Sequence, residues 1–244
     1  MTDPAESAQI GRMLDRIAAA TERLIATASR LTDEQVRAPS PLPGWTRGHV
    51  LNHLARNADG LRDLLFGAKT GIALPQYPSQ DVRDAEIEAG ATRPASEIAT
   101  DLANSAAAFA AQAGELDRDA WLAEVRGMRG PAHPAWFTLH RRLTEVEVHH
   151  VDLAAGYTPA DWPEPFVADL IDRVTAGLAE DEQCPSVMLV DSGAGRQYVI
   201  GAGAPPERAV SGPAHELAAW LIGRYTGAGL AVDPPGTLPE VPSY

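Results

Sequence analysis

The segment TEVEVHHVDL, residues 144–153, carries two glutamates and two adjacent histidines within six residues. The apolar pattern around it predicts one long helix from about Ala135 to Ala155. In such a helix Glu145, His149 and Asp152 share one face, because they are four and three residues apart. The segment therefore raises the question of whether an acid and an imidazole are placed there to hold a metal.

The apolar residues of the same helix indicate which side faces a core: they are Leu139, Leu143, Val146 and Leu153. They flank Glu145 and His149, whereas Glu147 and His150 are expected to point outward. A charge on the core side of a helical bundle is costly unless it is paired or binds a metal. On spacing alone, an ion pair between Glu145 and His149 is the alternative to a metal site. Gly156 is expected to end the helix as a C′ glycine.

A second predicted helix, from about Thr46 to Ala68, also carries inward polar groups. His53 lies between two leucines, and Asn57 follows one turn later on the same face. A single histidine in this position is commonly a core residue that bonds to a backbone carbonyl. Together with Glu145 and His149, however, His53 would complete two imidazoles and one carboxylate, the ligand set of an open catalytic zinc site. Nickel or iron could occupy the same set.

The composition excludes several classes of function. A formal net charge of −13 and a pI near 4.9 argue against nucleic acids and anionic membranes as partners. The single cysteine, Cys184, excludes an intrachain disulfide and a thiolate zinc cluster within one chain. With no secretory or membrane-spanning pattern, the cytoplasm is the expected compartment and a monomer the default expectation.

The chain pattern predicts a mainly α protein in which an antiparallel four-helix bundle is followed by a small α+β domain. We expect the bundle in residues 1–160 and the second domain in residues 161–244. The four long helices are predicted at Pro4 to Leu31, Thr46 to Ala68, Pro94 to Leu116 and Ala135 to Ala155. The second domain is predicted to contain a helix at Phe166 to Ala179, strands at Ser186 to Val190 and Gln197 to Ile200, a strand entering a helix at 209–225, and a proline-rich tail.

Three segments resemble the mycothiol-dependent maleylpyruvate isomerases, a family of DinB-like metal-binding four-helix bundles with an added carboxy-terminal domain. They are LPGWTRGHVLNHLARNADGL (42–61), EVEVHHVDL (145–153) and AVSGPAHELAAWLIGR (209–224). The first two are fairly specific for the fold and its metal site, and much less specific for the substrate.

The resemblance implies which residues form the site. Matched by position, His53, Glu145 and His149 are the implied metal ligands, and His49, one turn before His53, is the closest rival. Asp152 matches the family's aspartate and is implied to support a ligand or to cap the helix.

The third segment implies a role for Arg224, which matches a family arginine important for activity. Its guanidinium fork could bind a carboxylate of a small dianionic acid. The alternative is a cation that satisfies carbonyls at a helix end. Arg83 and Arg142 are further candidates for anion binding that no motif supports.

The function that the resemblance implies is the cis/trans isomerisation of maleylpyruvate to fumarylpyruvate, by addition and elimination of a zinc-bound thiolate. Because Cys184 is distant in sequence from the metal motifs, the nucleophile would come from a thiol cosubstrate, mycothiol. Two alternatives stay open. One is an S-transferase that releases the thiol adduct of an electrophilic metabolite, and the other is a non-catalytic helical binding module.

Overall fold

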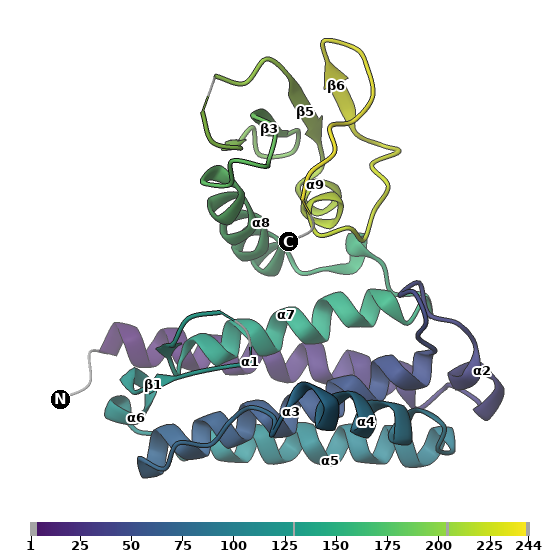
Figure 1. Ribbon diagram of the computed structural model, residues 1–244, viewed down its shortest axis with the longest axis vertical. Coiled ribbons are helices and arrows are strands. Elements are labelled where there is room, and N and C mark those ends of the chain that lie inside the picture. Colours follow the sequence, from purple (N-terminus) through teal and green to yellow (C-terminus); the bar gives the residue numbers. More distant parts are fainter. Residues whose placement is uncertain (1–3, 129, 204, 243–244) are drawn as a thin grey trace. The chain divides into compact units, whose positions relative to one another are not determined.

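The computed structural model describes residues 4–128, 130–203 and 205–242, and it divides into two compact units after Gly156 (Figure 1). Each unit is described by itself. The predicted division into domains at residue 160 stays a prediction, because compactness alone does not test independent folding.

The first unit is the predicted four-helix bundle. Its long helices are α1 Pro4–Ala28, α3 Arg47–Thr70, α5 Ala95–Gly114 and α7 Phe137–Asp152. The connections contain short elements: α2 Asp33–Arg37, α4 Gln80–Ala91, α6 Arg118–Leu122, β1 Glu124–Val125 and β2 His133–Pro134. Local sequence sets the helix starts. Thr46, for example, caps α3 by accepting a hydrogen bond from the His49 backbone N–H.

The four helices run as two opposed pairs (Figure 1). Ion pairs join Arg56 to Asp101 at 2.8 Å and Lys69 to Glu115 at 2.8 Å, so α3 and α5 run in the same direction. The long connection through α4 allows this, because it returns the chain to the end at which α3 began. Helix α7 runs antiparallel to α3, and this places the middle of each helix beside the middle of the other.

Helix α3 is the centre of the bundle, and its backbone is approached closely on one side. A Cβ atom on Gly48 would lie 2.3 Å from the Ala91 carbonyl oxygen, and one on Gly60 would lie 2.4 Å from the Gln76 carbonyl oxygen. Only glycine allows these approaches. The end of α4 and the loop before it are therefore packed directly on α3.

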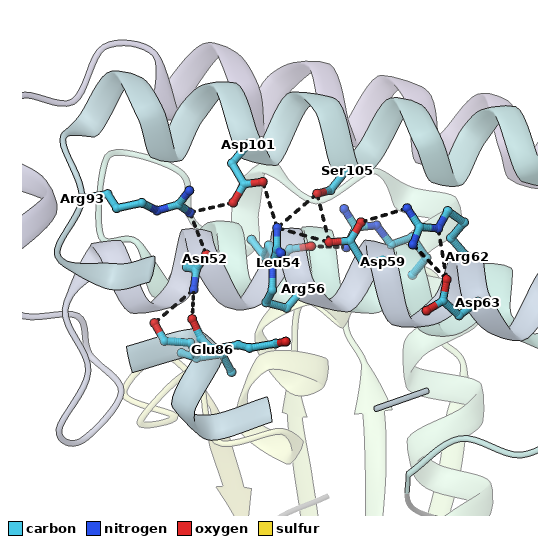
Figure 2. A network of polar contacts seen from close by, with 12 residues as sticks. Asn52, Leu54, Arg56, Asp59, Arg62, Asp63, Glu86, Arg93, Asp101 and Ser105 are labelled. Atoms are coloured by element: carbon cyan, nitrogen blue, oxygen red, sulfur yellow. Dashed lines mark hydrogen bonds and ion pairs between the residues drawn. The ribbon is translucent and has the colours of Figure 1, made fainter. Parts of the chain in front are cut away.

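A polar network fixes the rotation of α3 (Figure 2). Asn52 donates from Nδ2 to the Glu86 carbonyl oxygen at 2.8 Å and accepts from Arg93 Nη2 at 3.0 Å. Arg93 Nη2 also donates to Asp101 Oδ2 at 2.6 Å. These contacts join α3 to α4 and α5.

The end of α7 differs from the prediction. The helix ends at Asp152, three residues early, and Ala154 rather than Gly156 takes the first left-handed conformation, with φ 46°. The reason is a tertiary contact. Arg47 donates from Nε to the Leu153 carbonyl oxygen at 2.6 Å and from Nη2 to that of Ala154 at 3.2 Å. These carbonyls therefore need no further helical turn.

The expectation that Glu147 and His150 point outward was wrong. Both are buried, with 1% and 2% of their surface exposed. Helix α7 packs against α1 as well as α3, and α1 supplies the partners. Arg23 Nη2 donates to Glu147 Oε1 at 2.7 Å, and His150 Nε2 lies 2.9 Å from Thr27 Oγ1. Two faces of α7 are thus buried, each with its own polar contacts.

The second unit is the predicted small α+β fold. It contains η1 Pro159–Asp161, α8 Glu164–Ala179, β3 Val187–Asp191, β4 Gln197–Ile200, β5 Ala209–Gly212, α9 Ala214–Leu221 and β6 Ala231–Asp233. The strand order is β4-β3-β5-β6, with β3 and β5 parallel and the other pairs antiparallel. Strand β6 was not predicted, because in the sequence it directly adjoins the segment that is predicted as a proline-rich tail. Within the described ranges, no helix has the length and apolar character needed to cross a membrane.

Candidate metal centre

Helices α3 and α7 bring His53, Glu145 and His149 together. Glu145 Oε2 lies 2.9 Å from His53 Nε2 and 3.3 Å from His149 Nε2. The three prospective donor atoms lie within 4.8 Å of one another. The imidazole rings are perpendicular, at 90°, with centroids 4.8 Å apart. The arrangement directs two nitrogens and one carboxylate toward a common point.

Asp152 fixes the orientation of the His149 ring. Its Oδ2 lies 2.8 Å from His149 Nδ1, and only 2% of Asp152 is exposed. A buried carboxylate holds a proton on the nitrogen that faces it, so Nε2 is the nitrogen of His149 that faces Glu145 and is available to a metal. Metal-binding histidines are commonly held in this way.

The electrostatics of the cluster are those of a cation site. Burial alone would raise the pKa of Glu145, but the hydrogen bonds and charges of His149 and His53 hold it well below its usual range. Burial alone would lower the pKa of His149, but Asp152 and Glu145 raise it to about 9. Burial lowers the pKa of His53, with Glu145 opposing the shift. A divalent cation would displace the His149 proton and keep the carboxylate neutralised, so the donor set fits a metal.

The cluster opens into a small cavity of about 240 Å³. Its lining residues are His53, Asn57, Gln76, Tyr77, Gln80, Arg83, Met128, Arg141, Glu145 and His149. Arg83 lies at the mouth of the cluster, with Nη2 3.2 Å from His53 Nδ1 and Nη1 2.7 Å from Asp84 Oδ1. The cavity therefore combines a possible metal site with cationic side chains.

His49, the rival of His53, is placed outside the cluster. Its Nδ1 accepts from the Thr46 backbone N–H at 3.1 Å, and its Nε2 lies 3.0 Å from Glu88 Oε2. Both ring nitrogens thus serve the start of α3 and its contact with α4.

Arg142 does not line the cavity. It is fully buried and donates from Nη1 to the Leu54 carbonyl oxygen at 2.8 Å and to Asn57 Oδ1 at 2.9 Å. Burial lowers its pKa to about 10, against the opposing effect of Glu145, so the guanidinium stays charged at neutral pH. Arg142 joins the two ligand-bearing helices through Nη1. Its role toward an anion stays a prediction.

Arg224 lies in the second unit, beyond the end of α9, where Gly223 turns the chain with φ 71°. The Arg224 backbone N–H donates to the Ala219 carbonyl oxygen at 2.8 Å, and Nη1 donates to that of Ile222 at 3.0 Å. The structure thus places one guanidinium nitrogen at a helix end. Its role toward a substrate stays a prediction.

Sequence reasoning missed five cavity residues: Gln76, Tyr77, Gln80, Met128 and Arg141. The first two belong to the loop between α3 and α4, which the sequence marks only as a connector. Arg141 could have been found, because it lies four residues before Glu145 and so shares the ligand face of α7.

Comparison with protein families matches residues 17–154 to the mycothiol maleylpyruvate isomerase N-terminal domain and residues 161–243 to the MDMPI C-terminal domain. A crystal structure of the mycothiol-dependent maleylpyruvate isomerase is similar over 96% of this chain and 97% of that chain, with 29% identity and a TM-score of 0.90. The crystal structure of a histidine-to-alanine mutant of that isomerase matches over the same shares, with 28% identity and a TM-score of 0.89. The comparison with curated proteins gave no match.

Proposed function

The chain belongs to the mycothiol maleylpyruvate isomerase family, and from this premise we propose that it is a zinc- and mycothiol-dependent enzyme that isomerises maleylpyruvate to fumarylpyruvate. The observation that carries the proposal is the convergence of His53, Glu145 and His149 at a cavity that also holds cationic side chains. Three protein ligands leave one position on a metal open, as in catalytic sites, whereas structural sites are closed by four. The cationic side chains in the same cavity suit a small anionic substrate.

In the proposed holoenzyme, Nε2 of His53, Nε2 of His149 and the carboxylate of Glu145 would hold the ion. When bound, zinc supplies a Lewis acid that lowers the pKa of a thiol and favours the thiolate at neutral pH. Asp152 holds the Nδ1 proton of His149. Arg142 holds α7 against α3 through its bonds to Leu54 and Asn57.

The isomerisation needs a transient loss of the cis double bond. The thiolate adds to one alkene carbon, and the electron pair of the double bond moves into the conjugated carbonyl group as an enolate. The new single bond rotates, and collapse of the enolate expels the thiolate and restores the alkene in the trans form. No atom is gained or lost, and the thiol is regenerated.

The nucleophile in this scheme comes from outside the chain. The single cysteine, Cys184, lies in the second unit and is 3% exposed. Burial raises the pKa of its thiol, which makes it a poorer nucleophile near neutral pH. These properties support a thiol cosubstrate, and mycothiol is the thiol of the family.

Charge within the site must attract the substrate, because the whole chain carries a formal charge of −13. Arg83 and Arg141 supply positive charge at the cavity. We propose Arg224 as a further catalytic residue whose guanidinium binds a substrate carboxylate and stabilises the enolate that forms on addition.

The ligand assignment is tested by the zinc content of three variants purified with the wild-type chain. We expect His53→Gln and His149→Ala to lose bound zinc, and the matched variant His49→Gln to retain it, because the His49 ring contacts Thr46 and Glu88 and lies outside the cluster. Zinc retained by His53→Gln and lost by His49→Gln would move the site to the rival histidine. A zinc-free wild type that melts at the same temperature as His149→Ala would instead favour the non-catalytic module.

The reaction type is tested by the products formed from maleylpyruvate and mycothiol. Fumarylpyruvate with full recovery of the thiol supports the isomerase. A stable thiol adduct would show an S-transferase, for which the same metal ligands would serve.

A further inference from the structure

The wall of the cavity beside the metal cluster carries donor groups that have no acceptor. Tyr77 is 9% exposed, and its buried Oη has no hydrogen-bond acceptor among the described residues, since the neighbouring Arg83 guanidinium can only donate. Arg141 Nη1 is likewise buried with no hydrogen-bond partner among the described residues. Both residues line the cavity. A buried donor without an acceptor is unfavourable, and it is common where a ligand supplies the missing acceptor.

The position of Arg141 is built by specific neighbours. Gln76 Oε1 accepts from Arg141 Nη2 at 3.2 Å and from the Met128 backbone N–H at 3.1 Å. A Cβ atom on Gly127 would lie 2.0 Å from Arg141 Nη1, so a side chain there would displace the guanidinium from this position. Gln76 is itself placed by its close packing on Gly60 of α3.

The register of α7 directs this guanidinium to the reaction site. Arg141, Glu145 and His149 follow one another at intervals of four residues and so share one face of the helix. Tyr77 faces the same cavity from the loop between α3 and α4, where the Arg83 guanidinium lies 5.8 Å from its ring centroid. Burial and the charge of Glu145 raise the pKa of Tyr77, so its hydroxyl stays protonated and can donate.

We propose that Arg141 and the Tyr77 hydroxyl form a carboxylate-binding subsite beside the metal cluster. The subsite holds one carboxylate of a small dianionic acid and so orients the double bond of that acid relative to the cluster. A carboxylate fits because its two oxygens can accept from a guanidinium and a phenol together. A cavity of about 240 Å³ admits a small acid. The inference rests on the proposed function for the identity of the acid.

The test uses maleate, a cis dicarboxylate, as the probe and calorimetric titration of the zinc-loaded full chain as the assay. Arg141→Met and Tyr77→Phe are each expected to weaken maleate binding about tenfold to 150-fold, the range for a hydrogen bond to a charged group. Arg141→Lys should fall between Arg141→Met and wild type, because it keeps the charge and loses the fork. Arg62→Met is the matched control, since Arg62 pairs with Asp63 and does not line the cavity.

Tyr77→Phe separates binding from a structural role. Removing a buried hydroxyl that has no acceptor should leave the melting temperature unchanged or raise it, while maleate binding weakens. A structural tyrosine would lose stability instead. Because the change deletes one oxygen atom, this variant remains informative even if Arg141→Met does not fold.

Two results would overturn the subsite. One is maleate affinity within twofold of wild type in zinc-loaded Tyr77→Phe and Arg141→Lys. The other is a wild type that shows no maleate binding in the millimolar range. Neither result depends on turnover. A wild type that binds maleate through these residues and fails to convert maleylpyruvate would keep the subsite and refute the proposed function.

Discussion

Replacing Asp152 by Asn is expected to weaken zinc binding about 10–100-fold, which corresponds to about 1.4–2.7 kcal/mol. The carboxylate lies 2.8 Å from His149 Nδ1 and is almost fully buried, so no water can take its place without a rearrangement. An asparagine can present its NH2 group to Nδ1 instead. That contact would favour the tautomer with its proton on Nε2, the nitrogen that the ion needs.

The assay is a competition titration of zinc between the protein and a chromophoric chelator of known affinity. Asp63→Asn is the matched control, because Asp63 is a half-exposed carboxylate on α3 that pairs with Arg62. The control should bind zinc as wild type does. Zinc affinity of Asp152→Asn within twofold of wild type would refute the argument that Asp152 orients His149 for metal binding.

Three further outcomes are expected. In zinc-free protein the pKa of His149 is raised from 6.5 to about 9, so its ion pairs stabilise the fold fully below about pH 6.5. The melting temperature should therefore fall as the pH rises from about 6.5 to about 9. A melting temperature that stays constant over this range would contradict the ion pairs. Arg224→Met should keep its zinc, and its turnover should fall about 10²–10³-fold. The control Arg208→Met, in the same unit, should keep both its zinc and its turnover. Gly60→Ala should reduce the free energy of unfolding by urea by about 1–3 kcal/mol, whereas Gly114→Ala, where a Cβ meets open space, should not reduce it.

The helices were predictable because their signals are local. Apolar spacing marks the buried face of α3, and Thr46 marks its start through a contact that spans only three residues. The same holds for the shared face of Glu145 and His149. The meeting of His53 with Glu145 is different, since 92 residues separate them. No spacing rule connects them. The sequence suggested the set because both helices carry inward polar groups, and the family resemblance then implied the same three ligands.

The polar residues on the far side of α7 show what local patterns miss. Glu147 and His150 look like surface residues, because an acid and an imidazole on the face opposite a core usually meet water. Their partners, Arg23 and Thr27, come from α1 and lie more than a hundred residues away in the chain. The sequence contains no local sign that α7 has a second buried face.

The cavity wall was unpredictable for a related reason. Tyr77 belongs to a loop whose prolines predict only a connector, and its position depends on the contact of Gln76 with Gly60. A glycine in the middle of a helix normally weakens it. Here Gly60 allows a close approach that the sequence alone does not reveal.

The measurement that tests the central claim most directly is the rate of maleylpyruvate conversion by the zinc-loaded full chain, with and without mycothiol. Glu145→Gln, which removes the carboxylate shared by both histidines, is measured in the same assay. We expect the wild type to form fumarylpyruvate only when the thiol is present, and Glu145→Gln to lose that activity. Equal rates with and without mycothiol, or no conversion by protein that contains zinc, would contradict this expectation.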